Sequence, residues 1–119
     1  MSKEQPKLKI KRLRPNAKLP QRATPGSTGL DIFACIDGKE TITLAGTQPK
    51  AIPTGIAIEV PQGYDVQIRP RSGLSAKGVG VTFGTIDSDY RGEILITMYL
   101  FDPGATFEIR HGDRIAQMV

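Results

Sequence analysis

The sequence predicts an all-β domain, a closed sandwich or a jelly roll, and three observations support this. Thirteen glycines and nine prolines in 119 residues favour short segments joined by turns over long helices. Many segments are short apolar runs or alternate apolar and polar residues, as strands do. Turn residues separate them at regular intervals, which is typical of antiparallel sandwiches and jelly rolls. The length fits one domain, residues 1–119.

The first expected strands lie within residues 8–44. Leu8 and Ile10 alternate with lysines, which predicts an edge strand whose charges discourage association with other sheets. Residues 31–35 and 41–44 are short apolar runs, and the Asp-Gly pair at 37–38 predicts a turn between them.

The middle of the chain continues the pattern and contains the helix candidate. Residues 56–60 alternate and end at a Pro-Gln-Gly break, and the next strand, 66–68, leads into Pro70. Residues 72–77 are the helix candidate, with Ser72 as the residue that caps its first turn.

The last part of the chain predicts three strands. Residues 93–101 are apolar on nearly both faces, so we expect this strand to be covered on both sides, in a sandwich core or at a subunit interface. The Pro-Gly pair at 103–104 turns the chain into the strand 107–109, and 115–119 predicts the final strand.

Charge and cysteine content narrow the function classes. A net charge of +4 indicates an anionic partner, but the basic run at 7–14 carries no aromatic residues, so it predicts a solvated strand flank and not a nucleic-acid surface. The single Cys35, and the lack of an apolar run after Met1, predict a cytoplasmic protein without a disulfide or a secretory signal. No stretch reaches the roughly 18 apolar residues that a membrane span needs, so no membrane partner is expected.

Two segments combine turn residues with groups that bind metals or phosphates. Asp31 follows a glycine-rich turn, where a carboxylate suits a hydrated divalent cation or serves as a hydrogen-bonded turn residue. Arg71 offers a planar fork for phosphate oxygens, Ser72 stands at a helix start that favours anions, and Gly73 permits close backbone approach. A capped helical turn beside a surface salt bridge is the alternative for the second segment.

Two further segments carry dense polar groups. Residues 84–93 hold carboxylates, a tyrosine and an arginine between apolar strands, which predicts a hairpin that lines a pocket, with a charged hairpin tip as the alternative. In residues 111–117 the Gly-Asp turn permits a plain ion pair between Asp113 and Arg114. His111 has no evident nucleophile partner and is expected to be structural.

Taken together and in this order, the four segments resemble the signature motifs of the trimeric dUTPase family. The matching residues are 29–31, 70–74, 84–92 and 112–117. The resemblance runs from about Leu8 to the last residue. It implies a jelly-roll-like β-barrel, a homotrimer with active sites at subunit interfaces, and Mg²⁺-assisted hydrolysis of dUTP to dUMP and pyrophosphate.

The resemblance also implies roles for individual residues. Asp87 would orient the attacking water and bond the sugar 3′-hydroxyl, and Tyr90 would pack beneath the deoxyribose. Asp31 would meet Mg²⁺ through water. Main-chain groups of the hairpin at 81–86 would read uracil, so the residues expected to bind substrate are Arg71, Ser72, Gly73, Val81, Gly84, Thr85, Ile86, Tyr90 and Gln117.

The resemblance leaves two departures and two alternatives. Some family members have asparagine where Val81 stands, a change that reading of the base by main-chain groups tolerates. The family's glycine-rich C-terminal arm, which closes over the nucleotide, is expected to be missing after Val119. Its loss would reduce turnover more than binding. A dCTP deaminase shares the general fold, but Tyr90 and the run 87–89 are placed as in dUTPases. A regulator that keeps the nucleotide pocket with weakened catalysis is the alternative from another class.

Overall fold

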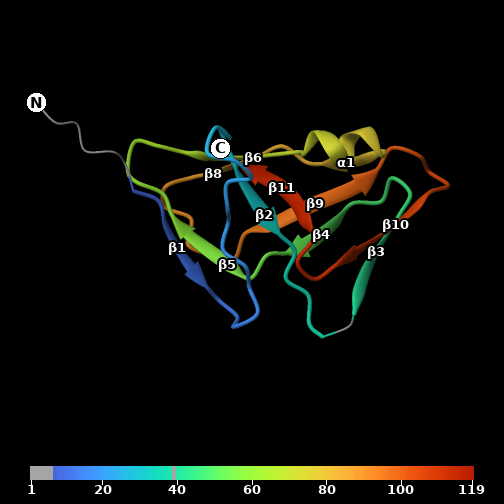
Figure 1. The fold of residues 1–119 in the computed structure, drawn as a ribbon, viewed down its shortest axis with the longest axis horizontal. Coiled ribbons are helices and arrows are strands. Elements are labelled where there is room, and N and C mark those ends of the chain that lie inside the picture. Colours follow the sequence, from blue (N-terminus) through green and yellow to red (C-terminus); the bar gives the residue numbers. More distant parts are fainter. Residues whose placement is uncertain (1–6, 39) are drawn as a thin grey trace, which may run out of the picture.

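The computed structural model describes residues 7–38 and 40–119. The prediction that no secretory signal is present concerns the first residues, which lie outside these ranges. The described residues form one short helix and eleven strands (Figure 1). These are β1 (Lys9–Arg12), β2 (Leu30–Phe33), β3 (Thr41–Ala45), β4 (Lys50–Pro53), β5 (Ile56–Glu59), β6 (Val66–Arg69), α1 (Ser72–Ala76), β7 (Val79–Val81), β8 (Gly84–Ile86), β9 (Leu95–Leu100), β10 (Thr106–Arg110) and β11 (Arg114–Met118).

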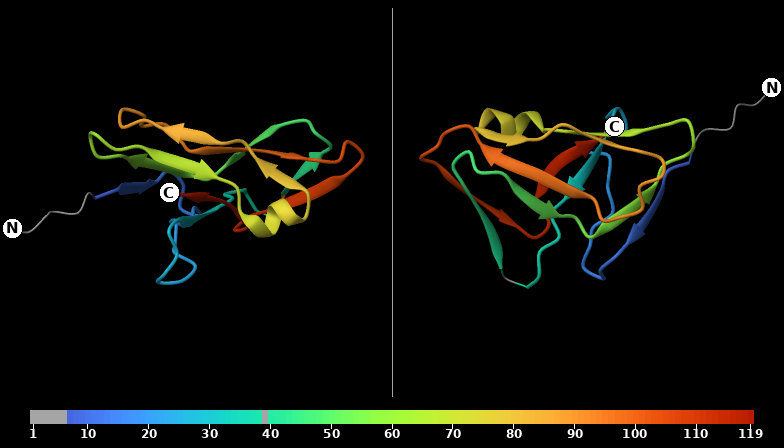
Figure 2. Two further views of the ribbon diagram at one scale, coloured as in Figure 1. Left: turned by 90° about the horizontal axis from the view of Figure 1, so that it is seen from above. Right: turned by 180° about the vertical axis from the view of Figure 1, so that it is seen from behind.

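The strands form four small antiparallel sheets that pair segments far apart in the sequence. The sheets are ordered β1-β5, β10-β3, β2-β11-β6-β8 and β4-β9-β7. Figure 2 shows these sheets wrapped around each other, with α1 beside β7 at one end. The arrangement confirms the predicted all-β, jelly-roll-like class.

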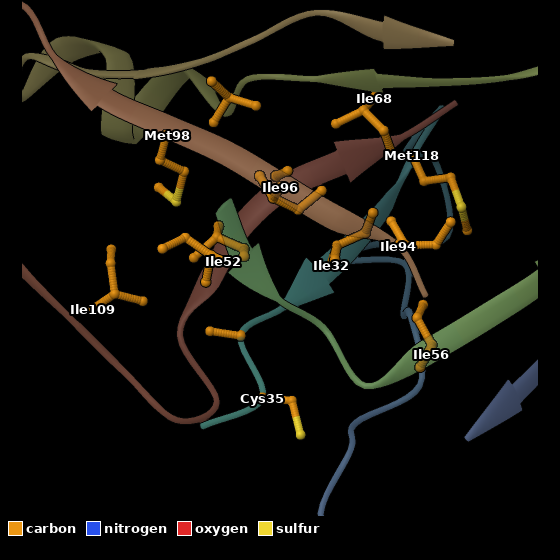
Figure 3. Close-up of a cluster of buried hydrophobic side chains, with 14 of the residues drawn as sticks. Ile32, Cys35, Ile52, Ile56, Ile68, Ile94, Ile96, Met98, Ile109 and Met118 are labelled. Atoms are coloured by element: carbon orange, nitrogen blue, oxygen red, sulfur yellow. The ribbon is translucent and has the colours of Figure 1, made fainter. Parts of the chain in front are cut away.

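A core of isoleucine, valine, leucine and methionine side chains lies between the sheets. Ile52 of β4 and Ile96 and Met98 of β9 are fully buried, and they face Ile32 of β2 across the interior (Figure 3). Burial of each such side chain stabilises the fold by about 1.5–3 kcal/mol. The core therefore fixes the positions of the strand ends, and these strand ends carry the polar residues.

Each strand expected from the sequence overlaps an observed strand, but two expected hairpins are wrong. The strands at 31–35 and 41–44 flank their turn without pairing, because β2 pairs with β11 and β3 with β10. The expected hairpins at 81–86 and 84–93 are each divided between two sheets, since β7 pairs with β9 and β8 with β6. Period-two alternation locates a strand but carries no information about its partner.

The helix start also differs from the prediction. Arg71 occupies the N-cap position of α1 without a side-chain capping bond, and Ser72 is already helical. The hydroxyl of Ser72 is therefore not used as the cap. Helix α1 has five residues, and no helix in the described ranges is long and apolar enough to cross a membrane.

Strand β9 is fully covered on one face only. Ile96, Met98 and Leu100 are buried, and so is Ile94 just before the strand, whereas Leu95 on the opposite face is 52% exposed. Thr97 and Tyr99 on that outer face are half-buried. Of the two expected settings, the sandwich core therefore accounts for one face of this strand, and the outer face is only partly covered in a single chain.

Candidate functional site

The residues singled out by the sequence gather in two separate pockets. We call the smaller the arginine pocket; it measures about 120 Å³ and is lined by Ala23, Ser27, Gly29, Asp31, Arg71, Ser72, Gly73 and Gln117. We call the larger the tyrosine pocket; it measures about 280 Å³ and is lined by Ile68, Gly84, Thr85, Ile86, Asp87, Tyr90, Glu93, Ile94 and Leu95. No residue lines both pockets.

Strand register places the floor of the arginine pocket. Asp31 of β2 and Gln117 of β11 are direct partners across the sheet, so their side chains point to the same face. Gly29 is buried beside them, and a Cβ atom there would lie 3.3 Å from Oε1 of Gln117 and 3.2 Å from the Met118 carbonyl oxygen. The glycine therefore leaves the space in which the Gln117 amide sits.

Two arginines balance the charge of Asp31, whose side chain is buried. Nε of Arg71 lies 3.6 Å from Oδ1, and Nε of Arg114 lies 3.8 Å from Oδ2. Arg71 also donates a hydrogen bond to the main-chain carbonyl of Arg114 at 3.4 Å. A buried carboxylate needs such partners. Two cations on one carboxylate leave the arginine pocket with a net positive charge that suits an anion.

Arg114 is a residue whose role the sequence reasoning missed. The expected ion pair between Asp113 and Arg114 is wrong, because Oδ2 of Asp113 accepts the main-chain N–H of Arg110 at 2.8 Å and Arg114 turns to Asp31. The β2–β11 pairing, which brings Asp31 beside the fourth motif, is the information that the sequence did not supply.

The start of α1 forms one wall of the arginine pocket. Its first backward hydrogen bond runs from the Ser75 N–H to the Arg71 carbonyl, so the N–H groups of residues 72–74 have no intrahelical acceptor. Ser72 and Gly73 are exposed. Main-chain donors, a hydroxyl and the Arg71 guanidinium thus converge where an oxyanion would bind.

The tyrosine pocket opens over a glycine. Gly84 stands opposite Ile68 in the β6–β8 pair, and a Cβ atom on Gly84 would approach Ile68 no closer than 3.9 Å. Ile68 and Ile86, both largely buried, line the pocket beside the main chain of Gly84, which no side chain covers. Thr85 is exposed at the edge of the same strand.

Tyr90 is held against its own loop. Its hydroxyl donates to the Glu93 carbonyl at 2.8 Å, and its N–H donates to the Asp87 carbonyl at 3.1 Å. Gly92 permits this arrangement, because a Cβ atom there would lie 2.6 Å from the Tyr90 oxygen. The ring is 45% exposed and the Asp87 carboxylate is exposed beside it, so both can contact a ligand.

Glu93 lies at the base of the tyrosine pocket and pairs with Arg14. The two guanidinium nitrogens approach its carboxylate oxygens at 2.7 and 3.3 Å. The hydrogen bond from Arg14 is the main reason that the pKa of Glu93 lies below its usual value, and the same bond raises the pKa of Arg14. The sequence predicted that Arg14 lies on a solvated strand flank, which is wrong, because its side chain is bound to Glu93. The two partners are 79 residues apart in the sequence, so no local pattern indicates this pair.

Besides Asp113 and Arg114, two singled-out residues lie outside both pockets. Val81 is buried in β7 opposite Met98, and its predicted contact with a base through main-chain groups stays a prediction. His111 accepts the Ile36 N–H at Nδ1 over 3.1 Å, a structural bond that agrees with the expectation for it.

The two pockets are carried by different strands of the same sheet. Asp31, Gln117 and Arg69 are partners across β2, β11 and β6, so they share one face, that of the arginine pocket. Ile68 and Met118 are the next pair along, so their side chains point to the other face, into the core. Thr85 of β8, the partner of Gln67, lies on the face of Arg69, so the tyrosine pocket at the β8 edge takes residues from both faces.

The donor set of the arginine pocket limits which metal site is possible. Within the ranges that the structure describes, no group of three or more His, Cys, Asp or Glu side chains could enclose a metal ion. Asp31 is the one carboxylate among the residues that line the arginine pocket. A cation held there would need its other ligands from water and from a bound anion.

Comparison with known proteins places this geometry in context. A family model described as dUTPase matches residues 15–119. The deoxyuridine 5′-triphosphate nucleotidohydrolase of Hydrogenobaculum sp. is 50% identical over 118 residues, covering 95% of this chain and 78% of the relative. The protein of the same name from Neorickettsia sennetsu is 48% identical, covering 86% of this chain and 68% of the relative.

Solved structures give the same picture. A mutant dUTPase from phage phi11 of S. aureus, described as coordinating a structural Mg(II) ion, superimposes with a TM-score of 0.84 at 27% identity, covering 95% of this chain and 88% of that one. The dUTPase of Staphylococcus bacteriophage 80alpha gives 0.82 at 28% identity with the same coverage.

Proposed function

This chain belongs to the dUTPase family, and on that premise we propose how its two pockets act as a dUTP nucleotidohydrolase that yields dUMP and pyrophosphate. The observation that carries the proposal is the division of its polar residues into an anion-binding set and a nucleoside-sized set. The two sets correspond to the two chemically different ends of dUTP.

The arginine pocket holds the phosphate chain. Arg71, the Ser72 hydroxyl and the main-chain N–H groups at the start of α1 donate to phosphate oxygens, and the Gln117 amide adds a further donor. The positive balance around Asp31 favours the triphosphate over a neutral ligand. Because these donors are fixed before the ligand arrives, they stabilise charge that grows during the reaction without reorganising.

The tyrosine pocket holds the nucleoside. Tyr90 packs beneath the deoxyribose and leaves no space for a ribose 2′-hydroxyl, while the segment Gly84, Thr85 and Ile86 contacts the base. Main-chain N–H and C=O groups match uracil and reject cytosine, whose donor and acceptor pattern is reversed. A thymine methyl group would overpack the pocket at a cost of about 1–3 kcal/mol.

Asp87 acts on the water. Its exposed carboxylate orients a water molecule in line with the bond to be broken and takes its proton as the oxygen attacks the α-phosphorus. The bond from that phosphorus to the bridging oxygen breaks, and the electron pair leaves with pyrophosphate. Positioning and charge neutralisation suffice for this displacement, so no covalent intermediate is needed.

The residues of the arginine pocket fit Mg²⁺ bound together with the triphosphate. Mg²⁺ keeps several waters and takes few protein ligands, so the single carboxylate of Asp31, contacting it through water, suits this ion. When bound, the ion neutralises charge on the phosphate oxygens. Because Asp31 already has two arginine partners, we expect it to bind metal with the nucleotide and not alone.

Two copies of the chain build each site. No residue lines both pockets, and different strands of the sheet carry them, so we infer that one nucleotide does not use both pockets of the same chain. The tyrosine pocket of one copy must meet the arginine pocket of another, and a homotrimer supplies three such junctions. The partly exposed outer face of β9, with Leu95 exposed, is a surface that such an assembly would bury. A cytoplasmic location stays a prediction.

Pyrophosphate release from dUTP, dTTP, dCTP and UTP, measured side by side with Mg²⁺, tests the proposal. We expect far more release from dUTP than from the other three nucleotides, and almost none from an Asp87→Asn variant. Ammonia from dCTP would instead indicate the deaminase. A rate unchanged in Asp87→Asn would mean that this site does not catalyse the reaction. Nucleotide binding with almost no release from the wild-type protein would favour the nucleotide-binding regulator.

A further inference from the structure

Arg14 and Glu93 form the most closely bound ion pair between distant segments of the described chain. Nη2 of Arg14 lies 2.7 Å from Oε2 of Glu93 and Nη1 lies 3.3 Å from Oε1, a two-point contact. The side chains are 34% and 24% exposed, unlike the strand-surface pair of Arg110 and Glu108 at 70% and 55%. Planar two-point contacts fix orientation as well as distance.

The pair is tied to a third segment. Oε2 of Glu93 also accepts the Gly55 N–H at 3.0 Å, and the Gly55 carbonyl accepts the Leu13 N–H at 2.7 Å, one residue before Arg14. Gly55 has a φ of +69°, and a Cβ atom there would lie 2.8 Å from the Ala17 Cβ. Three segments, those of Arg14, Gly55 and Glu93, are therefore in close contact at the Glu93 carboxylate.

What the pair holds is the end of the loop that carries Asp87 and Tyr90. The Tyr90 hydroxyl rests on the Glu93 main-chain carbonyl at 2.8 Å. Beyond Glu93 the chain is fixed independently, because the Thr54 hydroxyl donates to the Ile94 carbonyl at 2.6 Å and the Ile94 N–H donates to the Ile56 carbonyl at 2.9 Å. The Glu93 carbonyl and the Ile94 N–H belong to one planar peptide group, so the bond to Ile56 fixes that carbonyl as well. Arg14 instead fixes the Glu93 side chain, at the residue where the loop ends.

We propose that Arg14 is a positioning residue for catalysis: its two-point bond holds the side chain of Glu93, which lines the tyrosine pocket and ends the loop, and so keeps Tyr90 and Asp87 in place. The inference rests on the proposed function of that pocket. Arg14 does not line the pocket and touches no substrate. Its effect reaches the site through Glu93.

A purely structural role predicts a different result. The Thr54 and Ile56 bonds to Ile94 remain when Arg14 is removed, so strand β9 should keep its place and the fold should persist. A displacement of about 1 Å at a reacting group can cost up to 100-fold in rate. A positioning role therefore acts on nucleoside binding and on kcat, and leaves the arginine pocket unchanged.

The experiment compares Arg14→Ala, Arg14→Lys and the control Arg110→Ala in the full chain. Calorimetry gives the Kd of dUMP, which the tyrosine pocket holds, and of inorganic pyrophosphate, which the arginine pocket holds; dUTP turnover gives kcat. We expect Arg14→Ala to weaken dUMP binding and lower kcat by about tenfold each, with the Kd of pyrophosphate unchanged within about twofold. Arg14→Lys, which keeps the charge but not the planar fork, should recover part of the loss. Arg110→Ala should match wild type.

The contrary results are distinct. Equal dUMP affinity and kcat in a folded Arg14→Ala protein would overturn the inference, and so would a parallel loss of dUMP and pyrophosphate binding, which indicates a general structural defect. If Arg14→Ala does not fold, Arg14→Lys decides by the same ratio of the two affinities. A wild-type protein that releases no pyrophosphate from dUTP would overturn the proposed function, and with it this inference, whereas active wild type with equally active Arg14 variants overturns this inference alone.

Discussion

The arginine pocket and the tyrosine pocket are built in different ways. The first is formed by strand register and by a buried carboxylate, so Asp31 and Gln117 are placed by the β2–β11 pairing itself. The second is carried by the loop between β8 and β9, where Asp87 and Tyr90 are exposed and depend on contacts to remote segments. Anion binding should therefore tolerate local changes better than nucleoside placement and catalysis do.

The largest expected effect is on the chemical step. Asp87→Asn keeps the shape of the side chain but removes the base that takes the proton from water. Turnover of dUTP should fall about 100-fold or more while the Kd of pyrophosphate stays at the wild-type value, measured by pyrophosphate release and calorimetry. A loss of both in parallel would contradict the division of labour between the pockets.

The next effect tests whether the Asp31 carboxylate stabilises the fold by pairing with two arginines, independently of any bound metal. Asp31→Asn leaves Arg71 and Arg114 without their shared carboxylate, so the free energy of unfolding in urea should fall by about 1–2 kcal/mol, a value reduced by the exposure of Arg114. The loss should appear without Mg²⁺ and without nucleotide. Unchanged stability would mean that the Asp31 pairs contribute nothing to the fold.

A smaller effect tests the contact that places Tyr90. In Gly92→Ala the added Cβ would lie 2.6 Å from the Tyr90 oxygen, so the ring must move and KM for dUTP should rise by about three- to tenfold. Gly104→Ala is the matched control, because its Cβ would meet only an Asp102 oxygen at 3.7 Å. Equal KM values in the two variants would show that the position of Tyr90 does not matter.

The smallest effect is on acid stability. Since the folded pKa of Glu93 lies below its ordinary value of 4.5, its ionised form stabilises the fold above that value, and the contribution is lost as pH falls through the lower folded pKa. Between pH 6 and a pH of about 3, wild type should lose more stability than Glu93→Gln, by less than about 1 kcal/mol, in urea titrations. Parallel curves would exclude this contribution.

The sequence predicted most of the strands and several residues that line the two pockets, but it missed β4 and the contacts between distant segments. Asp87, Tyr90, Arg71 and Gln117 were identified because polar groups between apolar strands are conspicuous and match family motifs. Arg114 and Arg14 were misassigned, since their partners Asp31 and Glu93 are brought close only by strand pairing. Local patterns determine strands and turns, whereas partner choice depends on the packing of the whole chain.

The partly exposed outer face of β9 also shows that local sequence patterns do not identify what covers a strand. Its sequence is apolar on nearly both faces, and this pattern is the same whether a sheet or another copy of the chain covers the second face. The structure assigns one face to the core and leaves Leu95 exposed, which the sequence did not distinguish.

The central claim is that each site joins the tyrosine pocket of one chain to the arginine pocket of another. Asp87→Asn and Arg71→Ala chains, each nearly inactive alone, should be refolded together in equal amounts and assayed for pyrophosphate release from dUTP. Random assembly would pair two intact pockets in about a quarter of the sites, so up to about a quarter of wild-type activity should return. A mixture no more active than its separate components would show that both pockets act within one chain, contrary to this account.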